Sequence, residues 1–143
     1  MRVILDTNIF VSALISTSGP PARLVDAWAD GSFILVSHAI QLAELREVTR
    51  RGKVRMLIRA ATAGRLVNQI SLLADMPGTL PTIERSPDPR DDFLLALCEA
   101  GEADWLATGD KADLLALERH GGTRIVTAAR LAAELGLEGE RSG

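Results

Sequence analysis

Carboxylates and hydroxyls stand directly after short apolar runs of this chain, where an α/β protein places its chemistry. The run Val3–Leu5 is followed by Asp6, and the run Trp105–Thr108 is followed after one glycine by Asp110. A third run, Phe33–Val36, leads into Ser37. The carboxyl ends of parallel strands lie at one edge of a sheet, and ligands bind beyond that edge. The sequence therefore predicts that these polar residues gather at a single site.

Glu44 can reach the same edge from a helix. It lies seven residues after Ser37, about two helical turns on, so it shares the helix face of that cap residue. It has no basic residue three or four positions on, whereas Glu47 has Arg51 at that spacing and predicts a surface ion pair. An unpaired acid beside apolar residues is costly unless a cation compensates it. We therefore interpret Glu44 as a site residue.

A pair of acids opens a later helix whose apolar stripe is formed by Leu94, Leu95 and Cys98. Counted from Asp91, these residues lie at positions three, four and seven, so Asp91 shares the buried face. Asp92 fits this face less well and is the weaker candidate. Both acids also suit the positive end of a helix dipole, which is the alternative interpretation for one of them.

These acids form an all-oxygen donor set, and no histidine or cysteine accompanies them at the predicted edge. Such a set suits Mg²⁺ or Mn²⁺ rather than zinc. Either ion can orient a phosphodiester, activate water and stabilise the leaving oxygen. The sequence therefore predicts a metal-dependent nuclease, and the residues expected to be both catalytic and metal-binding are Asp6, Glu44, Asp91 and Asp110.

Other reactive residue types have simpler interpretations. Cys98, the only cysteine, lies in an apolar run and is interpreted as a buried small hydrophobe. His38 and His120 are interpreted as structural or solvated side chains. Trp28 and Trp105 are interpreted as core residues, because each lies among apolar neighbours.

Charge is unevenly distributed, although the net charge of the chain is only −3. Residues 46–65 contain seven basic residues against Glu47, and residues 84–113 contain nine acidic residues against three basic ones. A basic surface beside an acidic, cation-binding pocket fits a phosphate-bearing substrate. The alternative is two solvated helix faces.

Continuously apolar strands alternate with helical segments. Strands are expected at 3–5, 33–36, 105–108 and 125–126, with a short extended piece at 80–83; helices are expected at 8–15, 22–30, 38–51, 54–76 (one long or two short), 91–100, 111–117 and 128–135. This pattern predicts an α/β fold of three α/β/α layers around a central, mostly parallel sheet of four to five strands.

The length of 143 residues fits one domain, which we expect over residues 1–137, followed by a disordered polar tail over 138–143. No basic-then-apolar leader opens the chain, and no apolar stretch reaches the roughly 20 residues of a membrane span. We therefore expect a cytoplasmic protein without a membrane partner.

In their order and approximate spacing, several motifs resemble the PIN-domain nucleases. They are Val3-Ile4-Leu5-Asp6-Thr7-Asn8-Ile9, Ser37 with Glu44, Asp91-Asp92 and Thr108-Gly109-Asp110, and the resemblance runs from Arg2 to about Leu135. It implies an endoribonuclease that hydrolyses RNA phosphodiester bonds with Mg²⁺ or Mn²⁺. It implies that Asp6, Glu44, Asp91 and Asp110 line the metal site, that Asn8 and Thr108 orient these acids or the scissile phosphate, and that Asp113 occupies a weaker acidic position. Ser37 is a further orienting candidate.

Within this family the chain is most similar to the toxins of toxin–antitoxin pairs (VapC-like). This resemblance implies two protein partners, a cognate antitoxin that blocks the site and a second copy of the chain in a homodimer. We expect the dimer surface around Phe10, Ala13 and Leu14.

Two other functions compete with the nuclease. One is a non-catalytic module that binds RNA or protein on the same fold, because fold alone does not establish function. The other is a haloacid-dehalogenase-like phosphatase, which also begins with a strand that ends in Asp. That mechanism needs a second Asp two residues after the nucleophile, and this position is Asn8.

Overall fold

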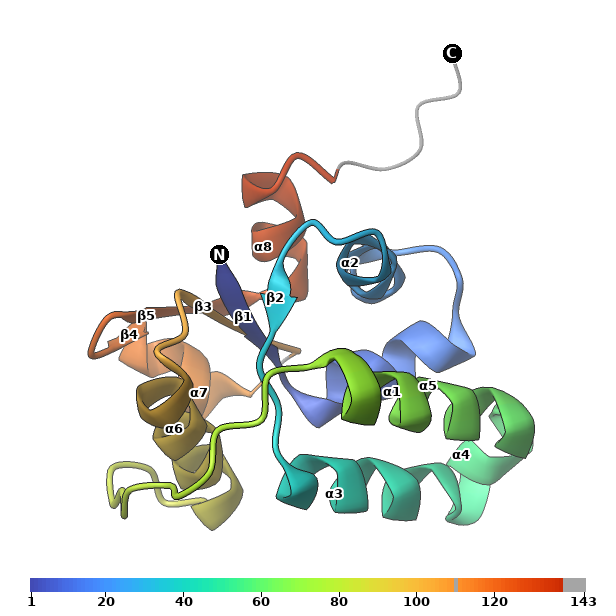
Figure 1. Ribbon diagram of the computed structural model, residues 1–143, viewed down its shortest axis with the longest axis horizontal. Helices are drawn as coiled ribbons and strands as arrows, with labels where there is room; N and C mark the ends of the chain where they lie inside the picture. Colours follow the sequence, from blue (N-terminus) through green and yellow to red (C-terminus); the bar gives the residue numbers. More distant parts are fainter. Residues whose placement is uncertain (110, 138–143) are drawn as a thin grey trace.

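A five-stranded sheet forms the centre of the computed structural model, which describes residues 1–109 and 111–137 (Figure 1). The strand order is β2-β1-β3-β5-β4, and all neighbouring pairs are parallel except β4 with β5. The strands are β1 (Arg2–Leu5), β2 (Ile34–Leu35), β3 (Trp105–Thr108), β4 (Arg119–His120) and β5 (Thr123–Thr127). The predicted three-layer fold with a mostly parallel sheet is confirmed.

Helices cover both faces of this sheet (Figure 1). They are α1 (Thr7–Ile15), α2 (Pro20–Ala29), α3 (Ala39–Thr49), α4 (Gly52–Leu57), α5 (Ala60–Leu73), α6 (Pro89–Gly101), α7 (Ala112–Leu117) and α8 (Ala128–Glu134). In the part of the chain that the structure describes, none is long and apolar enough to cross a bilayer. The tail predicted over 138–143 lies outside the described residues.

Alternating side chains of the central strands divide the apolar interior into two cores. In β1, Val3 and Leu5 face one core together with α1, α2, α3, α5 and α8, whereas Ile4 faces the other together with α6 and α7. In β3, Ala107 faces the same core as Val3 and Leu5, and Leu106 faces the same core as Ile4. Because a strand turns successive side chains to opposite faces, strands buried on both faces must be continuously apolar.

The structure differs from the sequence-based expectations at several element boundaries. Of the two alternatives for 54–76, the structure has two helices, α4 and α5, because Ile58 between them is extended (φ −127°, ψ 128°) and turns its side chain into the core. No strand forms at 80–83, where Leu80 and Ile83 instead pack against the core that contains Ile4, α6 and α7. The predicted dimer surface is wrong at Phe10, which is fully buried in the core of its own chain.

Gly101, the last residue of α6, allows this helix to approach Val36, the residue after β2, closely. A Cβ atom at Gly101 would lie 2.5 Å from Cγ1 of Val36, which is fully buried and cannot move aside freely. We expect Gly101→Ala to lower the free energy of unfolding by about 1–3 kcal/mol, measured by urea denaturation. The matched control is Gly64→Ala in α5, where the new Cβ would meet nothing within 4 Å. It should stabilise by up to about 1 kcal/mol, because alanine favours a helix. Equal stability of the two variants would contradict the close packing.

Candidate active site at the carboxyl edge of the sheet

Asp6 lies buried at the junction between β1 and α1, with only 3% of its surface exposed. Its backbone N–H donates to the carbonyl of Ala107 over 2.9 Å, and its Oδ2 accepts a 2.8 Å hydrogen bond from Oγ1 of Thr108. Both contacts follow from the parallel pairing of β1 with β3, which brings the ends of the two strands together. Thr108 therefore orients the Asp6 carboxylate.

Lys111 joins Asp6 to a second buried carboxylate. Its Nζ lies 3.5 Å from Asp6 Oδ2 and 3.6 Å from Asp91 Oδ1, and Asp91 is 2% exposed. The ammonium group of Lys111 thus pairs with two carboxylates that are almost fully buried. Sequence reasoning counted Lys111 only as one of three bases in an acidic segment, and did not place it in the site.

The two neighbouring acids of α6 have different surroundings. Asp91 Oδ2 accepts a 3.0 Å hydrogen bond from Ser86 Oγ, whereas its Oδ1 is buried without a hydrogen-bond partner among the described residues. Asp92 turns to the preceding loop, where its Oδ1 accepts from the backbone N–H groups of Arg85 (3.0 Å) and Ser86 (2.8 Å). The geometry therefore favours Asp91 as the site acid, and Asp92 positions the loop that carries Ser86.

The start of α6 explains why Asp91 faces the site. The helix begins at Pro89, two residues before the predicted start, because Asp88 caps it by accepting from the Arg90 N–H over 2.9 Å. That N–H is the main cause of the lowered pKa of the Asp88 carboxyl. The cap places Asp91 in the first turn on the buried side of the helix.

Glu44 approaches from α3 and is held by a hydroxyl. Its Oε1 accepts a 2.6 Å hydrogen bond from Thr7 Oγ1, and its side chain is partly buried. Glu44, Asp6 and Lys111 line one pocket of about 220 Å³, whose other walls include Ile40, Phe93 and Leu94. The pocket has a charged end and an apolar side, which suits a ligand with a charged centre.

Buried hydrogen bonds connect Ser37 and Gln41 to Thr7, the residue that holds Glu44. Ser37 Oγ donates to Gln41 Oε1 over 2.6 Å, and Gln41 Nε2 donates to the carbonyl of Leu5 (2.7 Å) and, at 3.5 Å, to Thr7 Oγ1. Ser37 therefore positions Gln41 rather than contacting a site acid directly. Thr7 and Gln41 were missed from the sequence, although both lie beside predicted site residues.

The structure does not join two other candidates, Asn8 and Asp113, to this cluster by hydrogen bonds within the described residues. Asn8 and Asp113 are exposed, and neither forms a hydrogen bond with Asp6, Glu44 or Asp91 within residues 1–109 and 111–137. Asp110 lies outside the described residues. The structure thus brings together Asp6, Glu44, Asp91 and Thr108 of the predicted set.

The histidines and the cysteine have structural surroundings. His38 caps α3, where its Nδ1 accepts from the Ile40 N–H over 3.1 Å, and His120 Nε2 lies 2.6 Å from Glu99 Oε2. Burial raises the pKa of the Cys98 thiol to about 12, so this thiol stays protonated at neutral pH. None of these groups is placed as a nucleophile in the carboxylate site.

The donor chemistry of the site fits a divalent cation. The available ligands are hard carboxylate oxygens, and one of them, Asp91 Oδ1, is buried without a hydrogen bond. Within the described residues, no three His, Cys, Asp or Glu side chains lie close enough to hold a metal ion by themselves. Lys111 instead supplies the positive charge that Asp6 and Asp91 share.

A comparison with protein-family models agrees with this fold. The model described as PIN domain matches residues 2–112, which include both strands that end at the site. The chain therefore belongs to the PIN domain family, whose members are generally nucleases. Searches of curated proteins and of solved structures give no significant match.

Proposed function

We propose that this PIN domain is a Mg²⁺- or Mn²⁺-dependent endoribonuclease whose metal site is formed by Asp6, Glu44, Asp91 and Asp110. The observation that supports it most is Asp91 Oδ1, which is buried beside the carboxylate of Asp6 and accepts no hydrogen bond within the described residues, with Lys111 Nζ 3.6 Å away. Buried polar atoms are nearly always paired, because an unpaired one costs free energy. A bound cation would give Asp91 Oδ1 a direct contact, which Lys111 at 3.6 Å does not supply.

Each site residue has a distinct role in this proposal. Asp6, Asp91 and Glu44 would hold the ion, which when bound activates water and stabilises charge on the phosphodiester. Hydrogen bonds from Thr108 and Ser86 keep the Asp6 and Asp91 carboxylates oriented before any ligand arrives. The hydroxyl of Thr7 does the same for Glu44.

The function is tested by incubating the purified protein with end-labelled single-stranded RNA in Mg²⁺, in Mn²⁺ and in EDTA, beside Asp6→Asn. We expect internal cleavage in both metals and none in EDTA. Cleavage that persists in EDTA would contradict metal dependence. RNA binding without cleavage in any metal would instead support the non-catalytic binding module.

Lys111 should stabilise the metal-free protein and compete with the ion. In Lys111→Met, two buried carboxylates lose their only close cation in the described structure, which strongly destabilises buried pairs. Because Lys111 is itself 25% exposed, we expect a smaller loss of about 1–3 kcal/mol in unfolding free energy, measured in EDTA. Mn²⁺ should raise the melting temperature of the variant more than that of the wild type, since it binds only the folded state.

The control for this measurement is Lys53→Met, which removes an exposed lysine of α4 and should leave stability and the Mn²⁺ response unchanged. An equal rise in melting temperature with Mn²⁺ in wild type and Lys111→Met would show that the lysine and the ion do not compete for the same position.

We further propose that the nuclease acts as the toxin of a toxin–antitoxin pair, with RNA as substrate, a cognate antitoxin as inhibitor and a homodimer as the active form. The support is the resemblance of the Asp6–Asn8, Glu44 and Thr108–Asp110 motifs to such toxins. Light scattering after size exclusion tests the dimer, and a monomer at high micromolar concentration would contradict it. Growth arrest on expression, lost in Asp6→Asn, tests the toxin role.

A further inference from the structure

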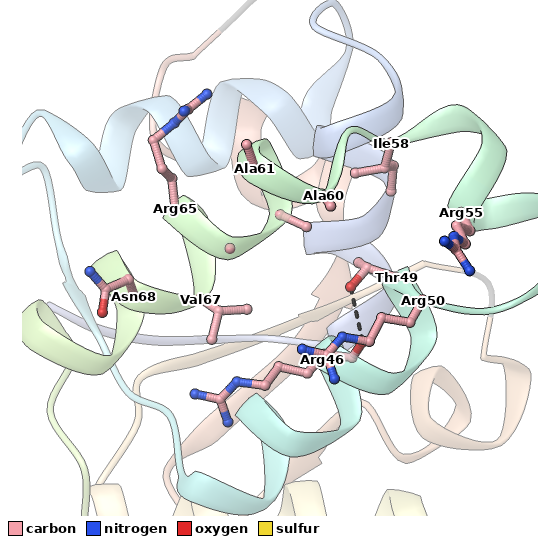
Figure 2. A pocket seen from close by; sticks show the side chains of 12 residues that line it. Arg46, Thr49, Arg50, Arg55, Ile58, Ala60, Ala61, Arg65, Val67 and Asn68 are labelled. Atoms are coloured by element: carbon pink, nitrogen blue, oxygen red, sulfur yellow. Dashed lines mark hydrogen bonds between the residues drawn. The ribbon is translucent and has the colours of Figure 1, made fainter.

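A second pocket, separate from the carboxylate site, opens between α3, α4 and α5 (Figure 2). Its volume is about 780 Å³. Four arginines line it: Arg46 from α3, Arg50 from the C-terminal cap of α3, Arg55 from α4 and Arg65 from α5. No acidic residue lines it, so the pocket has a strongly positive wall.

These four arginines differ from others on the surface because none has a carboxylate within 4 Å in residues 1–109 and 111–137. By contrast, Arg51 pairs with Glu47, and Arg130 lies 3.0 Å from Glu134. Guanidinium groups around one pocket repel one another, and a bound anion would relieve that repulsion. All four side chains are exposed and free to close on a ligand.

The pocket wall is suited to phosphate rather than to bases. No aromatic residue lines it, so it offers no platform on which bases could stack. Guanidinium groups bind phosphate oxygens in a bidentate manner, and such contacts position a strand without reading its sequence. Ala60 and Ala61 at the start of α5 are also among the lining residues, and their small side chains leave room for a backbone to approach.

Helix α3 connects this pocket to the candidate active site, because it carries Glu44 and Arg46 and ends at its cap residue Arg50. At 1.5 Å per residue, Arg50 lies about 9 Å further along the helix axis than Glu44. A stacked strand advances about 3.4 Å per nucleotide. At 3.6 residues per turn, however, Arg46 and Arg50 lie on a different side of α3 from Glu44, so a strand that lies at Glu44 has to curve around this helix to reach the arginines.

We propose that this arginine pocket binds the phosphodiester backbone of the single-stranded RNA substrate beyond the scissile bond. The proposal rests on the proposed nuclease function and extends it. Binding through phosphates alone makes the contribution of the pocket independent of base sequence and steeply dependent on salt.

The test is the double variant Arg50→Gln/Arg55→Gln, compared with Arg119→Gln/Arg130→Gln, which removes the same charge from exposed positions outside the pocket. Binding of a fluorescent single-stranded RNA is followed by anisotropy over a range of salt concentrations in EDTA, where no cleavage is expected. For the pocket variant we expect the slope of log affinity against log salt to fall by about 1.4, that is 0.7 for each lost phosphate contact. With equal affinity at 1 M salt, this corresponds at 0.1 M salt to roughly 25-fold weaker binding, the same for oligouridylate and oligoadenylate.

Three results would overturn the proposal. The first is no RNA binding by the wild type, and the second is an equal loss in both double variants, which would reflect general surface charge. The third is unchanged RNA binding with lost binding of poly-L-glutamate, which would assign the pocket to an acidic protein segment. Because binding is measured without metal, a failure to cleave RNA in Mg²⁺ would overturn the proposed function without changing the result of the binding experiment. Circular dichroism shows whether each variant is folded.

Discussion

Asp6→Asn is expected to reduce metal-dependent RNA cleavage by at least about 10²-fold while the protein stays folded. Asparagine has the size of aspartate and can still accept the hydrogen bond from Thr108 Oγ1, so the local structure is kept. It lacks the negative charge that would hold a cation, and removing one preorganised charged or polar group from an active site typically costs this much. The measurement is the initial rate of cleavage of end-labelled RNA at saturating Mg²⁺ or Mn²⁺.

The matched control is Asp26→Asn, which makes the same change at an exposed position of α2 and should keep the wild-type rate. Thermal denaturation in EDTA should show Asp6→Asn to be at least as stable as the wild type. The reason is that Lys111 then neutralises Asp91 alone rather than two buried acids. Wild-type cleavage by Asp6→Asn would show that the activity belongs to another site or to a contaminant.

Leu106→Ala is expected to lower the free energy of unfolding by about 2–5 kcal/mol. Leu106 lies in β3, which pairs with both β1 and β5, and its side chain is fully buried against α6. Truncation removes apolar contacts and leaves a cavity that the surrounding strands cannot close, since backbone hydrogen bonds hold them on both sides. Urea denaturation followed by circular dichroism gives the change.

Leu72→Ala is the control for this variant, because it makes the same truncation on a side chain that is 74% exposed at the end of α5. We expect its effect to stay within about 0.5 kcal/mol. Similar losses in the two variants would mean that β3 is not the centre of the sheet.

The polar residues at the strand ends could be predicted from the sequence, because they follow local patterns of apolar and polar residues. Continuously apolar runs predict strands buried on both faces, and polar residues after such runs predict the functional edge of a parallel sheet. These rules led to Asp6 and Thr108, and the helical spacing of apolar residues favoured Asp91 over Asp92. Short elements without a periodic signal were missed, such as β4, whose two residues form a strand only by pairing with β5.

The sequence by itself thus determined the α/β class, the family motifs and the acids at the edge of the sheet. Only the tertiary structure decided how these acids are held and neutralised, because their partners come from distant parts of the chain. Thr108 reaches Asp6 across 102 positions, and Lys111 lies between Asp6 and Asp91. Likewise, the folding of α3, α4 and α5 turns a basic stretch into a pocket. Charge, burial and hydrogen bonding at these places depend on which strands and helices become neighbours, and no local pattern specifies that choice.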